Sequence, residues 1–387
     1  MKKAVFAFLI AVLSLTCIQP VFADTYTRYP PYDVGFSGGS GYTQGVAWYD
    51  YTHSVNLTNG IAKVRASVIS EFVGGAVAEA WGFMGIEWTT PGDGGGGCPF
   101  FFTWNGTYYV LDNNLLPQSE MSNGTDVDDY YKLEQPPIAK NGKYTLLISE
   151  FEHEHDFIDQ VKLIALDHAS DVKIAVTSKG EILTYRQPLA PLSCIDNNGT
   201  SRLNEVASMD GNISDTTTYF EGYPDDYLIL NFGKIDAENA KLILRDDIKC
   251  MDVCIEVQVP SKTGDWQTVE VLNPRDYWAI EAVDLSKYVV KDEDLLVRLY
   301  WTSPHRLDYV GLDTSPQASI EVHQAFLLSA FHSTQGNVKP LLMKNDQTYT
   351  ELIPGEQIQL AFLLQNNQNE ERTFILYAEG HYGTIAP

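Results

Sequence analysis

The sequence is short of positive charge. Its 387 residues include 26 lysines and arginines against 51 aspartates and glutamates, which gives a formal net charge of −25 at pH 7. A chain this acidic is repelled by nucleic acid and by anionic lipid surfaces, so neither is expected as a partner. It would attract Ca²⁺ or cationic partners, although a solubilising surface explains the acidic excess more simply.

Long apolar runs are missing too. The run at residues 4–15 is too short to cross a bilayer as a helix, and no later stretch is long enough, so no transmembrane anchor is expected. Lys2 and Lys3 precede this run and a small-residue cleavage site after Ala23 follows it, which is the pattern of a secretory signal peptide. We therefore expect a secreted or cell-surface protein. Cleavage would leave 24 basic against 51 acidic residues, a net charge of −27.

Cysteine is scarce, and four cysteines follow the signal peptide: Cys98, Cys194, Cys250 and Cys254. An even number in an exported protein favours two disulfides. We expect Cys250 to pair with Cys254 and Cys98 with Cys194, while two other pairings stay open. The CxxC and HxxxH spacings of zinc sites are absent, which argues against zinc.

Five Asn-X-Ser/Thr sequons indicate exposed turns. In a host with an N-glycosylation pathway they would carry glycans, so these positions are predicted to lie at the surface. The sequons start at Asn56, Asn105, Asn123, Asn198 and Asn212.

Stretches with helical periodicity are absent, and apolar residues alternate with polar ones instead, as in half-buried strands. Residues 294–301 and 358–364 alternate in this way, with their apolar side chains on one face. Asn105-Gly106 predicts a type I′ hairpin turn between two aromatic strands, and Asn141-Gly142 predicts a second turn. We predict an all-β chain of two to three antiparallel units that resemble β-sandwiches or jelly rolls.

Two stretches rich in glycine or proline, near residues 90–97 and 186–200, are candidate boundaries between these units. The predicted organisation is a signal peptide (1–23), an N-terminal Gly/Ala/aromatic β region (24–97), a β-sandwich unit (98–195), a jelly-roll-like β unit (196–325) and C-terminal strands that complete a sandwich (326–387).

Several motifs follow one another in order from residue 98 onward. They read CPFFFTWNG at 98–106, EHEHDFIDQVKLIALDH at 152–168, DLLVRLYWTS at 294–303 and IPGE at 353–356. In this order they resemble a β-rich extracytoplasmic module of bacterial and archaeal surface proteins, which often follows repeats of the FG-GAP or tetratricopeptide type. The resemblance implies a secreted binding or scaffolding unit and carries over no catalytic residue. This chain lacks the upstream repeats and has residues 24–90 in their place.

The densest group of metal-binding residue types lies at residues 152–156. On a strand, alternate side chains face opposite sides, which would put the two histidines on one face and the three carboxylates on the other. The histidines would need a further ligand for zinc or copper, such as Asp167 or His168. Carboxylates on a loop would instead suit Ca²⁺. The candidate ligands are Glu152, His153, Glu154, His155 and Asp156.

A simpler interpretation of the same residues is a solvated polar lead-in at the exposed end of a strand. The strand itself is predicted from the alternation that follows. Its apolar face would carry Phe157, Val161, Leu163 and Ala165.

A second acidic group, Asp126, Asp128 and Asp129, has the D-x-D spacing found in Ca²⁺ loops. It lacks the glycine and the distal glutamate of an EF-hand, so a structural Ca²⁺ ion and an exposed acidic turn both remain open.

Aromatic residues offer a possible sugar-stacking surface, although alternation along the chain would bury about half of them as core. The candidates are Trp104, Tyr108, Tyr109, Tyr130 and Tyr131. Trp278, Trp301 and Tyr309 are predicted to be core residues.

Taken together, these features predict a non-enzymatic binding or structural protein of the cell surface or the extracellular space. Its partner would be a glycan, another protein or further copies of itself, with Ca²⁺ as the candidate cofactor. A hydrolase acting on extracellular polysaccharide is one alternative, although pairs of carboxylates carry little weight in so acidic a chain. A metal-binding surface protein is the other.

Overall fold

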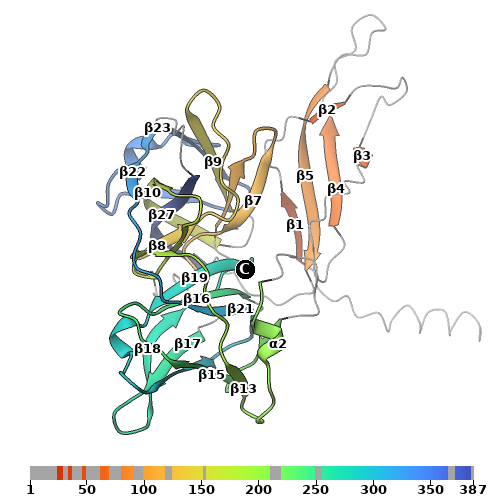
Figure 1. Ribbon diagram of the computed structural model, residues 1–387. Coiled ribbons are helices and arrows are strands. Elements are labelled where there is room, and N and C mark those ends of the chain that lie inside the picture. Colours follow the sequence, from red (N-terminus) through yellow and green to blue (C-terminus); the bar gives the residue numbers. More distant parts are fainter. Residues whose placement is uncertain are drawn as a thin grey trace, which may run out of the picture. The chain divides into compact units, whose positions relative to one another are not determined.

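A computed structural model defines the protein (Figure 1). It describes residues 99–117, 124–150, 154–209, 219–248, 255–364 and 371–384 with their side chains, and five strands between residues 24 and 90 by their backbone. Every sheet is antiparallel, and the described helices are single turns. The prediction of an all-β fold built from antiparallel sheets is therefore confirmed.

The chain forms two compact units, residues 1–94 and 95–387. The first unit contains one sheet in the strand order β1-β5-β4-β3, and β2 also pairs with β5. Its strands are β1 (Asp24–Arg28), β2 (Val34–Phe36), β3 (Val46–Trp48), β4 (Ala62–Val68) and β5 (Ala80–Thr90).

Two sheets of the second unit form a first sandwich around a shared apolar core, to which Phe101 and Leu146 contribute from one sheet and Leu163 and Leu376 from the other. One sheet has the order β24-β23-β26-β9-β6-β7 and the other β22-β10-β27-β8, with β25 paired to β10. The strands are β6 (Phe100–Trp104), β7 (Tyr109–Asn114), β8 (Val127–Lys132), β9 (Lys143–Ser149), β10 (Glu154–His168), β22 (Glu321–Gln324), β23 (Phe326–His332), β24 (Gly336–Asn337), β25 (Thr350–Leu352), β26 (Gln357–Leu363) and β27 (Glu371–Thr384).

Two further sheets form a second sandwich, whose core surrounds the fully buried Trp301. Their orders are β13-β15-β20-β17-β18 and β14-β21-β16-β19. The strands are β13 (Ser193–Asp196), β14 (Phe220–Gly222), β15 (Tyr227–Lys234), β16 (Lys241–Ile248), β17 (Ile255–Pro260), β18 (Trp266–Leu272), β19 (Ala279–Asp284), β20 (Asp294–Trp301) and β21 (His305–Asp313). The described single-turn helices of this sandwich are α2 (Leu203–Val206) and η2 (Ser286–Tyr288), whereas η3 (Lys339–Leu342) lies against β10 and β23 of the first sandwich.

The first sandwich is built from two separate stretches of the chain. Its strands come from residues 100–168 and 321–384, and the second sandwich occupies the sequence between them. The C-terminal strand β27 pairs with β10 along almost its whole length. The first sandwich therefore cannot close until the residues that follow the second have been made.

A small hairpin joins the two sandwiches. It consists of β11 (Lys173–Val176) and β12 (Ile182–Tyr185). Ile174 and Val176 pack with Ile375 of the first sandwich, whereas Ala175, on the opposite face of β11, packs with Ile243 of the second. Because alternate side chains of β11 point to opposite sides, one face of the hairpin covers the first sandwich and the other face covers the second.

Both predicted turns are present, but they differ in position and geometry: Asn105-Gly106 joins β6 to β7, whereas Asn141-Gly142 lies between the bridged residues Lys140 and Lys143 at the start of β9. Asn141 and Gly142 both have positive φ, 54° and 72°, as a two-residue type I′ turn requires. At the other turn only Gly106 has positive φ, and the Asn105 carboxamide oxygen accepts hydrogen bonds from the backbone N–H of Thr107 and Tyr108. The predicted type I′ geometry is wrong there, because the loop spans four residues between β6 and β7.

A β-bulge changes which residues of β10 face the core. The pairing of β10 with β27 shifts between Ile158 and Gln160, so one extra residue, Asp159, stands at this position. Val161, Leu163 and Ala165 belong to the core as predicted, together with Ile158. Phe157 does not, because an extra residue reverses the two faces of a strand on one side of the bulge.

Candidate metal centre

Strand alternation brings Glu154 and Asp156 to the inner face of β10. They precede Ile158 on the face that points into the first sandwich, and their exposed fractions are 1 % and 0 %. The expectation of a solvated lead-in at an exposed strand end is therefore wrong for these two carboxyl groups. Asp156 pairs with Leu352 of β25 on one side and Tyr382 of β27 on the other, which encloses it in the sheet.

A third carboxyl group, Glu150, joins them from the opposite sheet. It directly follows β9 and is also fully buried. The backbone N–H of Glu150 donates to the carbonyl of Glu356 (3.1 Å), and the N–H of Gly355 donates to the carbonyl of Glu150 (2.9 Å). The turn of the IPGE motif thus holds Glu150 by its backbone and leaves its side chain to face the interior.

Ligand oxygens of Glu150, Glu154 and Asp156 lie within 4.8 Å of one another. Three carboxylates this close in a region of low dielectric cannot all be ionised unless protons or a cation compensate their charge. Thr350 lies on the same inner face, beside Ile158, and its buried hydroxyl has no hydrogen-bond partner among the described residues. A set of oxygen donors suits hard cations, Ca²⁺ above all.

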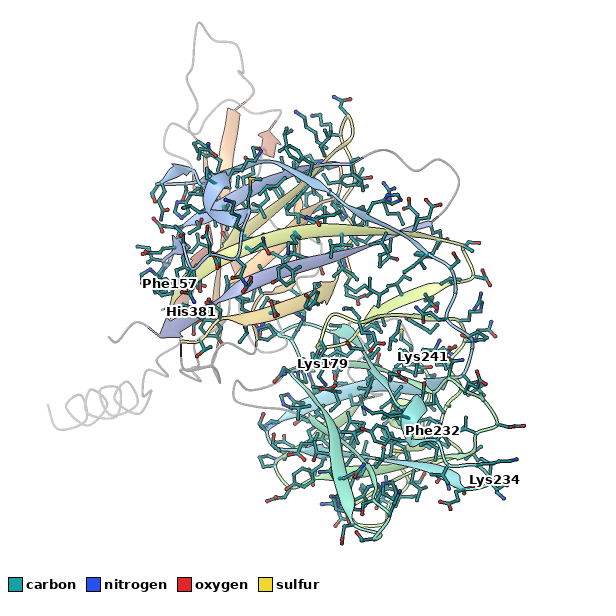
Figure 2. The ribbon with its side chains drawn as sticks, turned by 90° about the vertical axis from the view of Figure 1, so that its left-hand side faces the viewer. Phe157, Lys179, Phe232, Lys234, Lys241 and His381 are labelled. Atoms are coloured by element: carbon teal, nitrogen blue, oxygen red, sulfur yellow. The ribbon has the colours of Figure 1, made fainter. Side chains whose placement is uncertain are left out.

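His155 lies on the outer face of β10. His155 points away from the carboxylates, and its Nε2 lies 3.0 Å from a carboxylate oxygen of Glu351. Its ring packs at a tilt against Phe157, with ring centroids 4.2 Å apart. Phe157 stacks in turn on His381, with centroids 4.8 Å apart (Figure 2). His155 therefore cannot share a metal with Glu154 and Asp156.

The other proposed ligands of this group do not join it. His168 and Asp167 lie at the far end of β10, roughly 40 Å away at the rise of an extended strand. Asp167 pairs through both carboxylate oxygens with Arg372, at 2.5 and 2.6 Å. Glu152 and His153 lie outside the described residues.

Asp167 also belongs to a second group of potential ligands, together with Glu321 and His323. The Arg372 guanidinium already supplies the positive charge that a cation would bring, so this group is a weaker metal site than the buried trio.

The three aspartates with D-x-D spacing do not converge on one point. Because β8 is a strand, Asp128 and Asp129 face opposite sides. Asp129 points inward and pairs with Arg275, while Asp128 accepts a hydrogen bond from the Tyr377 hydroxyl (2.6 Å). Asp126 binds His381 Nδ1 at 2.7 Å. These contacts do not bring the three carboxyl groups together as one set of ligands.

A buried carboxyl group elsewhere in the first sandwich has a strongly raised pKa. Burial raises the pKa of Asp112 to about 7, although the Tyr131 hydroxyl and the backbone N–H groups of Gln135 and Glu134 donate to it and act in the opposite direction. The pKa values of Asp247 and Glu281 are likewise raised to about 7 by burial.

The expected Cys98–Cys194 disulfide is not present, because Cys194 is a free thiol. It is fully buried in β13 within the core of the second sandwich, and burial raises its pKa to about 12. Cys98, Cys250 and Cys254 lie outside the described residues.

Two of the sequon asparagines can be placed. Asn198 is exposed in the turn after β13, and Asn105 lies in the hairpin turn between β6 and β7. Asn56, Asn123 and Asn212 lie outside the described residues.

Sequence reasoning identified Glu154 and Asp156 but missed Glu150. The spacing of the three carboxyl groups, at i, i+4 and i+6, fits neither a single strand nor a helix. Their convergence depends on the chain crossing from one sheet to the other between β9 and β10, which local spacing does not reveal.

No protein-family model and no curated protein matches the sequence. Among solved structures, a point mutant of the VP2 protein of infectious bursal disease virus, from derived T=1 particles, aligns with 95 % of this chain and 74 % of its own. The identity is 6 % and the TM-score 0.12, a likeness too low to carry an argument.

In the part of the chain described here, no helix is both long enough and apolar enough to cross a membrane.

Proposed function

We propose that this is an exported, non-enzymatic binding or structural protein of the cell surface, and that its first sandwich is completed by a divalent cation. The observation that carries the proposal is the buried trio Glu150, Glu154 and Asp156, whose ligand oxygens lie within 4.8 Å of one another. Ca²⁺ is the preferred ion, because every side-chain donor is an oxygen and the nearby His155 points away.

The position of the trio supports a structural role for the ion. Glu150 extends one sheet, while Glu154 and Asp156 begin the central strand of the other. An ion between them would tie the two layers together where the carboxylates would otherwise repel each other. Extracellular modules bind Ca²⁺ with dissociation constants of about 10⁻⁴–10⁻³ M, which matches the expected export of this acidic chain.

The test is thermal unfolding of the mature protein in EGTA and at increasing CaCl₂. A cation that binds only the folded state adds about 2.7 kcal/mol at a hundred times its dissociation constant, so Tm should rise with CaCl₂. The double variant Glu154→Gln/Asp156→Asn should lose this dependence. It should also be at least as stable as the wild type in EGTA, because two like charges have been removed.

The matched control is Asp171→Asn, which removes an exposed carboxylate and should keep the full Ca²⁺ dependence. Equal Tm values of the wild type in EGTA, CaCl₂ and MgCl₂ would overturn the proposal, as would a Ca²⁺ response that survives in the double variant.

A further inference from the structure

The outer face of the five-stranded sheet of the second sandwich carries a group of aromatic side chains. β20 alternates strictly: Leu295, Val297, Leu299 and Trp301 are buried, as the sequence predicts, so Arg298 and Tyr300 point outward. Tyr227 of β15 is directly opposite Tyr300, and Trp266 begins the edge strand β18. All four outward side chains belong to partly exposed residues.

These aromatic rings surround one guanidinium group. The central carbon of the Arg298 guanidinium lies 4.9 Å from the ring centre of Trp266, 5.5 Å from that of Tyr227 and 5.7 Å from that of Tyr300. Contacts of this kind fix the positions of large side chains that would otherwise move freely on an open sheet. The result is a rigid platform built from strands rather than loops.

A chain of hydrogen bonds runs across the sheet beside the platform. Arg298 Nε donates to the Gln258 side chain (2.5 Å), and Gln258 Nε2 donates to a Glu256 carboxylate oxygen (2.7 Å). Thr268 Oγ1 donates to the same Glu256 oxygen (2.7 Å). Among the described residues, Arg298 donates only through Nε, which leaves its two terminal nitrogens as donors for a ligand.

The two sheets of this sandwich differ in how their outer faces are used. The hairpin β11–β12 packs on the face of the other sheet, against Ile243 and Tyr309. On the five-stranded sheet, no described element packs against the platform in a comparable apolar cluster. A row of partly exposed aromatic rings on such a face is costly for a protein with no use for it, since smaller polar residues would serve.

We propose that this platform, formed by Tyr227, Trp266, Arg298 and Tyr300, binds a neutral polysaccharide. Aromatic rings pack against the apolar C–H faces of sugar rings, while the Arg298 guanidinium, Glu256 and Thr268 provide hydrogen-bonding groups for sugar hydroxyls. The surrounding charge selects against acidic glycans, because Glu256 on β17 is paired with Tyr300 beside the platform and the Tyr300 hydroxyl donates to Asp225 (2.6 Å). The negative net charge of the chain also disfavours binding of acidic glycans.

The site lies in the second sandwich and does not involve the proposed cation. Either proposal can therefore fail without the other.

The experiment is affinity gel electrophoresis of the full mature chain in gels that contain one polysaccharide each. The neutral panel is hydroxyethylcellulose, β-1,3-glucan, xylan, galactomannan and galactan; alginate and polygalacturonate form the acidic panel. At least one neutral polysaccharide should retard the wild type. Trp266→Ala should weaken this binding about tenfold or more, because truncation of a large aromatic side chain in a binding site commonly has that effect.

Arg298→Lys keeps the positive charge and loses the planar fork of donors, so it should also weaken binding. The control is Phe331→Ala, which removes an exposed aromatic ring from the first sandwich. Unchanged Tm values confirm that the variants fold. The proposal is overturned by no retardation in the neutral panel, by retardation in acidic gels alone, or by equal effects of Trp266→Ala and Phe331→Ala.

Discussion

Asp112→Asn removes a single buried charge and should make the protein more stable at neutral pH. Burial raises the pKa of Asp112 from 3.8 to about 7, the net result after three hydrogen-bond donors have lowered it. At 1.36 kcal/mol per pKa unit, the difference between the folded and unfolded states amounts to about 4 kcal/mol. Only 6 % of the residue is exposed, so solvent screens this effect little.

The sign follows from the direction of the shift. Because the folded-state pKa of Asp112 is higher than the unfolded value, folding favours the protonated carboxyl group. Its contribution to stability is complete below about pH 4 and is lost as the pH rises to about 7, above which it no longer changes. Asparagine has almost the same shape and cannot ionise, but its Nδ2 atom cannot accept the hydrogen bond that the Gln135 N–H donates to Asp112 Oδ2. Loss of this buried hydrogen bond costs about 1–3 kcal/mol at every pH. Relative to the wild type, the variant should therefore gain up to about 4 kcal/mol between pH 4 and pH 7–8, starting from a lower stability near pH 4.

Urea unfolding of both proteins at pH 4, 5, 6, 7 and 8 measures this difference, which should grow by about 1.4 kcal/mol per pH unit up to pH 7. The comparison isolates Asp112, since Asp247 and Glu281 titrate equally in both proteins. Asp171→Asn is the control, because the Arg186 side chain lowers the pKa of this exposed group and no such gain should appear. A variant whose stability relative to the wild type falls as the pH rises would refute the reasoning and show that the three donors outweigh burial.

Three further outcomes are expected. Arg275→Met should destabilise the protein by about 3–5 kcal/mol in urea unfolding, because it leaves the buried Asp129 carboxylate uncompensated. The control Lys179→Met removes an exposed ion pair and should change stability by less than about 1 kcal/mol. Gly380→Ala should lower Tm and cost about 1–3 kcal/mol, because its new methyl group would collide with a backbone carbonyl of β10 next to the bulge. Iodoacetamide should leave Cys194 unmodified in the native protein and alkylate it in urea, because the thiol is buried and burial raises its pKa to about 12. Mass spectrometry of the tryptic peptide measures this difference.

Alternation in the sequence predicts strands well where the pattern is regular. In β20 the buried and outward residues follow the predicted order without exception. In β10 the same reasoning places Val161, Leu163 and Ala165 correctly and fails at Phe157. The failure has one cause, the extra residue at Asp159. The alternation of apolar and polar residues does not predict where a strand contains a bulge.

Contacts between distant segments explain the other differences. Glu150 and Asp156 belong to different sheets, and β25, which borders Asp156, comes from a segment almost 200 residues later. The sequence predicts that the C-terminal strands (326–387) complete a sandwich, but it does not show which one. Local spacing therefore identified two of the three carboxyl groups of the metal centre, and the third appears only when the two sheets are packed together.

The bulge at Asp159 explains both the outward position of Phe157 and the inward position of Glu154 and Asp156. Without the extra residue, the face of β10 that carries Val161, Leu163 and Ala165 would continue into Phe157 and His155 and would bury them in the core. With it, Phe157 and His155 stack on the outer face beside His381, and Glu154 and Asp156 turn inward toward Glu150. A single inserted residue thus exchanges a hydrophobic end of the core for a carboxylate cluster. Carboxylates this close repel one another unless protons or a cation compensate their charge, which is the physical reason that we propose a cation there.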